Sequence, residues 1–187
     1  MFFAGTHLAG ALCVAALVPP TNRRSLILMY DLLKTHQRLD LHERALTVQG
    51  YAALEPIEVD TYLREGAAAF DKAVEVKQTS SPFDYKLHPY VRPYFVQGSQ
   101  QMIDEGHHRE AMSWIVGGYN VAIVAIVNDA SPADKQHFQQ RFDVLLDRCG
   151  FASMEALPAR IEQTRLLAEE VFLLADDWVA KNPEILE

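Results

Sequence analysis

The sequence predicts an all-α protein, an up-and-down bundle of about seven or eight helices. Apolar residues recur at spacings of three and four along most of the chain, which is the period of an α-helix. No stretch alternates polar and apolar residues for long, so strands are not expected. Proline, glycine, serine and aspartate divide the periodic segments at short intervals, which predicts short connections between helices.

Composition places the chain among globular proteins with a real core. Its 187 residues suit one domain, so we expect residues 1–187 to form a single helical bundle. Hydrophobic residues make up 49% and charged residues 22%, and the net charge of −8 argues against direct binding of nucleic acid. Cys13 and Cys149, the two cysteines, both lie in apolar helical contexts. This pattern predicts buried free thiols in a reducing, cytoplasmic setting, without a disulfide framework.

Residues 1–20 carry no charge and end in Pro19-Pro20, which cannot continue a helix. The segment lacks the basic start and the cleavage site of a signal peptide, and it is slightly short for a membrane span of roughly 20 residues. We therefore expect no membrane partner. The expectation is an ordered apolar helix that packs on the bundle or forms an interface with a partner.

Three helices follow, each preceded by a residue whose side chain can cap a first turn. They are predicted to run from Thr21 to about Arg38, over 41–54 after Asp40, and over 61–76 after Asp60. The polar connection over 77–90 contains too many apolar residues to be a free linker, so no domain boundary is expected there. The next helix ends at Gly106, and Pro93 requires that it either begins near Arg92 or kinks there.

The central helix is predicted over 107–130, and nearly every residue of 121–127 is apolar. A helix that is apolar all round must be covered all round, so it lies in the middle of the bundle or half of it lies against a second chain. Gly117 and Gly118 each cost about 1 kcal/mol in a helix interior relative to alanine. They indicate close helix packing or, alternatively, a notch where a ligand approaches the backbone.

The last two helices have clear boundaries. Ser131-Pro132 with Asp134 predicts a helix start, and Gly150 predicts the corresponding end. Pro158 opens the final helix, which Asn182-Pro183 ends. The core stripe predicted for this final helix is Ile161, Leu167, Val171, Leu174 and Trp178.

No complete catalytic, metal or cofactor pattern is present: the chain lacks CxxC, HExxH, paired ExxH, GxSxG and a glycine-rich phosphate loop. We therefore predict no catalytic residue, no metal and no cofactor. One cluster, over 84–95, mixes phenols and cations in a way that suits stacking of a ring and neutralisation of an anion. The predicted ligand-binding residues are Tyr90, Arg92 and Tyr94, faced across a helical hairpin by Arg109, Glu110, Trp114 and Tyr119. In the alternative interpretation, the tyrosines fill a helix crossing.

The stretches HPYVRPYF and IDEGHHREAMSWIVGGYNVAIVAIV carry a resemblance that covers about residues 84–180. They resemble the helical C-terminal, substrate-binding domain of nucleotidyltransferase-like proteins of the kanamycin nucleotidyltransferase type. The catalytic domain of that family has a Gly-Ser turn and a strand with paired aspartates that hold magnesium. Gly98-Ser99 lies inside a helical pattern here and no Asp-x-Asp strand follows, so the catalytic half is missing.

The resemblance implies a domain that is catalytically incomplete alone and shapes a cleft for a small polar or nucleotide-like ligand. Its expected partner is a catalytic domain or a second copy, as in a dimer. The alternative function is a ligand-sensing or protein-interaction bundle, such as the effector domain of a regulator. A neighbouring catalytic domain would favour the first function, whereas a neighbouring helix-turn-helix would favour the second.

Overall fold

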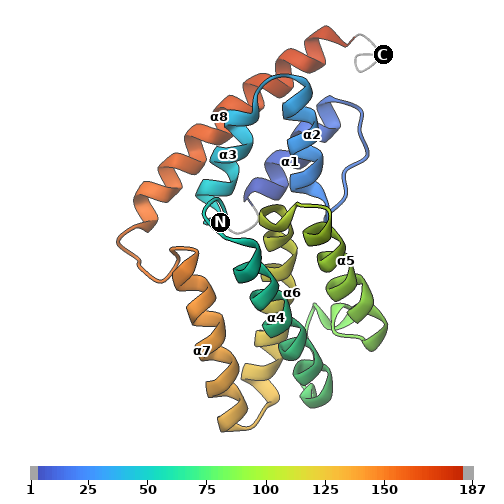
Figure 1. The fold of residues 1–187 in the computed structure, drawn as a ribbon, viewed down its shortest axis with the longest axis vertical. Helices are drawn as coiled ribbons and strands as arrows, with labels where there is room; N and C mark the ends of the chain where they lie inside the picture. Colours follow the sequence, from blue (N-terminus) through green and yellow to red (C-terminus); the bar gives the residue numbers. More distant parts are fainter. Residues whose placement is uncertain (1–3, 183–187) are drawn as a thin grey trace. The chain divides into compact units, whose positions relative to one another are not determined.

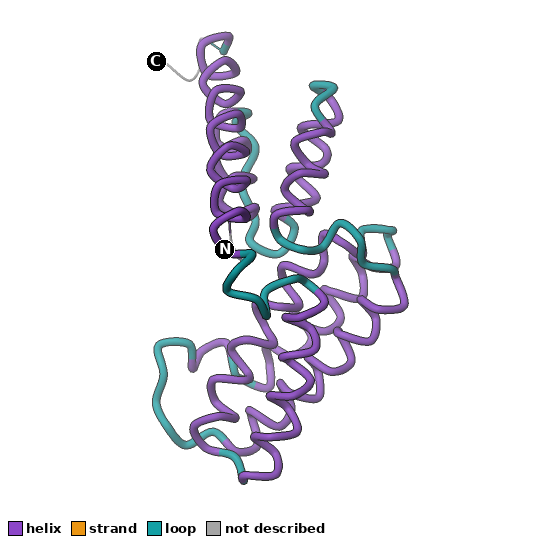
Figure 2. The backbone as a smooth tube through the Cα atoms, turned by 90° about the vertical axis from the view of Figure 1, so that its left-hand side faces the viewer, coloured by secondary structure: helices purple, strands orange, loops and turns teal. Residues whose placement is uncertain are grey.

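The computed structural model describes residues 4–182, which contain eight α-helices, two short 3₁₀ turns and no strand. Figure 1 shows the helices in chain order, and in Figure 2 the described chain is drawn as helix and loop throughout. The prediction of an all-α protein with about eight helices is confirmed. The helices are α1 (Ala4–Ala15), α2 (Ser25–Thr35), α3 (Leu39–Val48), α4 (Pro56–Val76), α5 (Arg92–Asp104), α6 (His108–Asp129), α7 (Pro132–Arg148) and α8 (Leu157–Lys181).

Packing divides the chain into two compact units, whereas the sequence predicts one domain over residues 1–187. Unit 2 comprises residues Leu54–Ala152, and unit 1 comprises the chain on either side of it. The division follows from α8, which packs against α1 and α3 rather than against its neighbour α7. The connection over 77–90 lies inside unit 2, in agreement with the expectation that it is not a domain boundary.

Unit 1 is a ring of four helices. α1 packs between α8 and α2, and α3 packs between α2 and α8. Each helix contributes a stripe of buried apolar side chains to the shared core. The larger ones are Leu8, Leu12 and Cys13 on α1, Leu26, Met29 and Leu33 on α2, Leu41 and Leu46 on α3, and Leu167, Val171 and Trp178 on α8.

The apolar N-terminal segment is therefore a core helix of its own chain. The apolar stripe of α1 is covered by α2 and α8, while Val14 and Leu17 at its end are exposed. Residues 1–3 of the predicted interface segment lie outside the described residues. On α8 the predicted core residues Leu167, Val171 and Trp178 are buried, whereas Leu174 is half-buried and Ile161 is exposed.

The three predicted caps in the first half of the chain are wrong. α2 begins after Arg24 rather than Thr21, and α3 begins after Arg38, whose guanidinium engages the Asp40 carboxylate that was expected to cap it. α3 also ends before Gly50, whose φ of 79° stops it short of residue 54.

α4 begins at Pro56, four residues before the expected cap at Asp60. Glu55 and Glu58 form a reciprocal capping box, and Pro56 takes the first helical position, where its missing N–H costs nothing. Asp60 is therefore an ordinary residue of the second turn.

The predicted boundaries in the second half are confirmed. α5 begins at Arg92, so Pro93 lies in its first turn and causes no kink. Ser131 Oγ accepts a hydrogen bond from the backbone N–H of Asp134 at 3.2 Å at the start of α7. Gly150 has a φ of 72° just beyond the end of that helix. Asn182 ends α8, and Pro183 lies outside the described residues.

Unit 2 is built on the pair α4 and α6. α5 packs against both helices, and α7 packs chiefly against α6. Gly118 explains how α5 comes so close: a Cβ at this position would lie 2.2 Å from Cε2 of Phe95. Phe95 also stacks on Phe70 at 5.8 Å and lies beside Gly66 of α4. Of the two interpretations of the mid-helix glycines, close helix packing is the one found at Gly118.

α6 is central to unit 2 but is not covered all round. Ala122, Ile123 and Ile126 are buried, whereas Val124 and Val127 on the opposite side are exposed. By length and composition α6 could cross a membrane, yet 61% of its most apolar window is buried inside the protein. A core helix has the same character, so this property carries little weight.

Candidate functional site

The aromatic segment, residues 83–94, presents rings to solvent. The segment contains two 3₁₀ turns, η1 (Asp84–Lys86) and η2 (Pro89–Val91), between α4 and α5. Phe83 and Tyr94 are 46% and 49% exposed, and Tyr85 and Tyr90 are 69% and 87% exposed. Tyr85 and Tyr90 therefore do not fill a helix crossing, and most of each side chain is accessible to a ligand.

Cationic and titratable side chains lie among these rings. The ammonium of Lys86 lies 5.3 Å from the ring centre of Phe83 and 5.8 Å from that of Tyr85, within the range of a cation–π contact. His88 stacks on Tyr90 with ring centres 4.9 Å apart, and its Nδ1 accepts the backbone N–H of Tyr90 at 3.3 Å. The segment thus combines flat rings with positive charge.

A carboxylate at the end of α6 holds the start of the same connection. Asp129 Oδ2 accepts the backbone N–H groups of Gln78 and Thr79 at 2.7 and 2.8 Å, and Oδ1 accepts the Thr79 hydroxyl at 2.5 Å. These hydrogen bonds lower the pKa of Asp129, with the Thr79 hydroxyl as the largest cause. Lys77 pairs with Asp84 at 3.2 Å, so the chain leading into the aromatic segment is fixed by charge.

Arg92 and Tyr94 have partners within the fold. The Arg92 guanidinium binds the Asp71 carboxylate of α4 in a bidentate pair at 2.5 and 2.8 Å, which raises the pKa of Arg92. Tyr94 meets Trp114 of α6 edge to face, with ring centres 5.3 Å apart. Of the predicted binding residues, Tyr94 and Trp114 are thus brought together, and Arg92 is neutralised by a carboxylate.

The remaining predicted residues lie elsewhere in unit 2. Arg109 is half-buried and Glu110 is buried in the first turn of α6, with His107 Nδ1 3.9 Å from the Glu110 carboxylate. Tyr119 is fully buried and packs on Phe142 of α7 with ring centres 5.0 Å apart. Tyr119 therefore contacts α7, whereas Tyr94 and Trp114 contact each other.

A second candidate surface, which sequence reasoning missed, is the groove between α4 and α7. It has a volume of about 530 Å³ and is open to solvent. Apolar and polar side chains share its lining, and exposed Ile57 and Val144 are among them. The lining residues are Ile57, Glu58, Thr61, Tyr62 and Glu65 of α4 and His137, Gln140, Arg141 and Val144 of α7.

A ladder of three ion pairs joins α4 and α7, and the first two pairs include residues that line this groove. Glu58 binds Arg148 at 2.6 and 3.0 Å, Glu65 binds Arg141, and Lys72 lies 3.8 Å from Asp134. Each step is seven residues forward on α4 and seven back on α7, which is the register of two antiparallel helices. The seven-residue spacing of these charges is visible in the sequence and could have predicted the ladder.

Tyr119 lies close to the middle pair of the ladder, because its ring is beside Gly66 and packs on Phe142, the chain neighbours of Glu65 and Arg141. Burial raises the pKa of its phenol, and the charges of Glu65 and Arg141 act on it in opposite directions. Its hydroxyl has no hydrogen-bond partner among residues 4–182, although buried polar groups nearly always have one.

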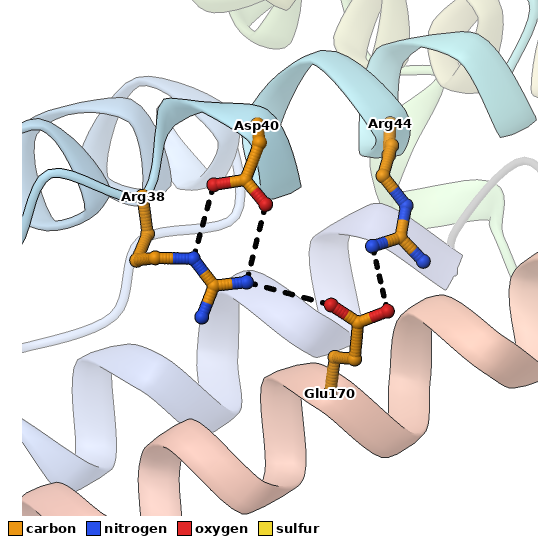
Figure 3. Close-up of polar contacts among 4 residues, drawn as sticks. All are labelled: Arg38, Asp40, Arg44 and Glu170. Carbon is orange, nitrogen blue, oxygen red and sulfur yellow. Dashed lines mark hydrogen bonds and ion pairs between the residues drawn. The ribbon is translucent and has the colours of Figure 1, made fainter.

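Unit 1 holds a separate cluster of charges, shown in Figure 3. Arg38 binds Asp40 at 3.0 and 3.1 Å and reaches Glu170 of α8 at 3.4 Å, while Arg44 binds the other oxygen of Glu170 at 2.8 Å. Two arginines face two carboxylates, so every charge in the cluster is matched. We interpret the cluster as a structural contact that holds α3 against α8.

The described part of the chain offers no site for a metal ion or for thiol chemistry. Within residues 4–182, no three His, Cys, Asp or Glu side chains converge closely enough to hold an ion. Cys13 and Cys149 are free and buried, and burial raises the pKa of Cys13, which disfavours its reactive thiolate.

Comparison with protein-family models, curated proteins and solved structures finds no significant match to this chain.

Proposed function

We propose that this chain is a helical binding domain without reaction machinery of its own, whose ligand docks on the aromatic segment. The ligand class is a flat ring that carries negative charge, such as a nucleotide. This agrees with the resemblance to substrate-binding domains of nucleotidyltransferase-like proteins, in which catalysis belongs to a partner domain in the cytoplasm. A ligand-sensing bundle of a regulator would use the same surface for the same chemistry.

The observation that carries the proposal is the exposure of Tyr85 and Tyr90. Rings that are 69% and 87% exposed contribute little to packing, and exposed apolar patches commonly mark binding sites. Stacking of one base on an aromatic side chain contributes about 1–3 kcal/mol. Lys86, adjacent to both Phe83 and Tyr85, supplies the positive charge that Arg92 cannot supply while it is paired with Asp71.

The test is isothermal titration of the full chain with ATP, GTP and UTP, together with an amino-sugar, kanamycin. Tyr90→Ala should weaken nucleotide binding by about 5- to 150-fold, the equivalent of one lost stacking contact. Lys86→Ala should weaken ATP more than adenosine, because only ATP carries the phosphates. Thermal stability should change little in either variant, since both side chains lie at the surface.

Phe172→Ala provides the matched control, because Phe172 is 51% exposed but lies on α8 in unit 1. It should leave nucleotide binding unchanged. Equal loss of binding in the Tyr90 and Phe172 variants, or no heat with any nucleotide at millimolar concentration, would refute the proposal.

A further inference from the structure

The groove between α4 and α7 shares no residue with the aromatic segment and has chemistry of its own. We propose that it binds a small zwitterion, a molecule with one ammonium and one carboxylate, such as an amino acid. Glu65 would receive the ammonium, Arg141 the carboxylate, and the buried Tyr119 hydroxyl would provide the third polar contact.

Charge balance selects a zwitterion over a singly charged ligand. Glu65 and Arg141 neutralise each other across the groove, and the Glu65 side chain is only 17% exposed. A ligand with one charge that enters between them pairs with one partner and leaves the other unpaired in a partly buried position, which is costly. A zwitterion replaces both halves of the pair at once.

The hydroxyl of Tyr119 gives the site a buried polar group. Its hydroxyl is buried without a hydrogen-bond partner in the described chain, and it lies near enough to Glu65 and Arg141 for both charges to act on it. Tyr119 does not line the open groove, but its ring lies beside Gly66 and packs on Phe142, the chain neighbours of Glu65 and Arg141. A ligand that separates the pair therefore reaches a hydroxyl that can donate one hydrogen bond and accept another.

The other two rungs of the ladder are less suited to opening. Glu58 also accepts the backbone N–H of Glu55 at 2.9 Å, so its displacement from Arg148 would disturb the start of α4. Lys72 and Asp134 do not line the groove, and Lys72 has a second partner in Glu75 at 3.0 Å. The middle rung lies among the polar lining residues Thr61, His137 and Gln140.

The experiment is a titration of the full chain, followed by NMR, with glycine, β-alanine and γ-aminobutyrate. These probes carry the same two charges at increasing separation. N-acetylglycine and glycinamide serve as the singly charged analogues of glycine. The amide signals of α4 and α7 should move with at least one zwitterion, and the analogue lacking either charge should bind at least 10-fold more weakly.

Three variants assign the site. Arg141→Gln and Tyr119→Phe should each weaken binding about 10- to 150-fold, the usual range for a lost hydrogen bond to a charged group. Lys72→Gln removes the neighbouring rung outside the groove and should leave the affinity unchanged. Circular dichroism checks that each variant is folded. Because the Arg141 side chain is half exposed, Arg141→Gln tests the site even if Tyr119→Phe perturbs the core.

The proposal fails if no zwitterion shifts these signals, if the singly charged analogues bind equally well, or if Lys72→Gln weakens binding as much as Arg141→Gln. Loss of nucleotide binding in Tyr90→Ala with zwitterion binding intact would show that the two sites are independent.

Discussion

Gly118→Ala tests the packing at the centre of unit 2. Alanine normally stabilises a helix interior relative to glycine by about 1 kcal/mol. At position 118, however, the new Cβ would lie 2.2 Å from Cε2 and 2.6 Å from Cδ2 and Cζ of Phe95. Carbon atoms in favourable contact are about 3.5–4.0 Å apart, so the ring or α5 must move by more than about 1 Å. Phe95 cannot move freely, because it is buried between Gly66 and Phe70.

Gly10→Ala supplies the matched comparison. Gly10 lies inside α1, and a Cβ there meets nothing within 4 Å, so only the helix-propensity gain applies. Overpacking of a core costs about 1–3 kcal/mol, and the fixed ring places Gly118→Ala in the upper half of that range. Since the propensity gain is common to both variants, the difference in their effects on unfolding free energy should be about 2–3 kcal/mol.

Urea unfolding followed by circular dichroism measures both variants against the parent protein. A stabilisation by Gly118→Ala that equals that of Gly10→Ala would refute the close approach of α5 to α6. The double variant Gly118→Ala with Phe95→Leu should recover part of the loss, because the smaller side chain frees the space.

Two further predictions concern acidic side chains. The pKa of Asp129 in the folded protein is lower than its ordinary value of 3.8. The hydrogen bonds of the Asp129 carboxylate therefore stabilise the protein fully above pH 3.8, and this stabilisation is lost as the pH falls through the folded pKa. Amide exchange of Gln78 and Thr79 should lose protection in that acidic window, and Asp129→Asn should remove the pH dependence; protection unchanged by the variant would contradict the assignment. Glu58→Ala removes the Glu58 half of the capping box and the pair with Arg148 and should cost about 1–2 kcal/mol, whereas Glu58→Gln, which can still cap, should cost less than half as much by thermal unfolding. Equal losses in the two Glu58 variants would mean that the cap contributes nothing.

Sequence signals were sufficient where a helix end depends on its own residues. Ser131, Pro132 and Asp134 form one local motif, and Arg92 with Pro93 restricts where α5 begins, so both starts were predictable. Asp40 failed as a cap because a competing partner, Arg38, takes its carboxylate. The positions of the side chains in three dimensions decide which partner a carboxylate takes, and the sequence pattern does not show those positions.

Helical geometry separates two of the predicted binding residues on α6. Trp114 and Tyr119 are five residues apart, which places them about 140° apart around α6. They therefore contact different neighbours, Tyr94 in one case and Phe142 in the other. The exposure of the Tyr85 and Tyr90 rings could not be foreseen, because the sequence does not show that residues 84–91 form two 3₁₀ turns.

The ring of unit 1 has a consequence for the order in which the protein can form. Three of its helices precede unit 2 in the chain, whereas the fourth, α8, follows it. During synthesis unit 2 has all its residues before α8 leaves the ribosome, and domains generally fold as units as they emerge. Until α8 emerges, α1 and α3 lack the helix that covers part of their apolar faces. We expect these faces to be exposed, or bound by a chaperone, while unit 2 folds.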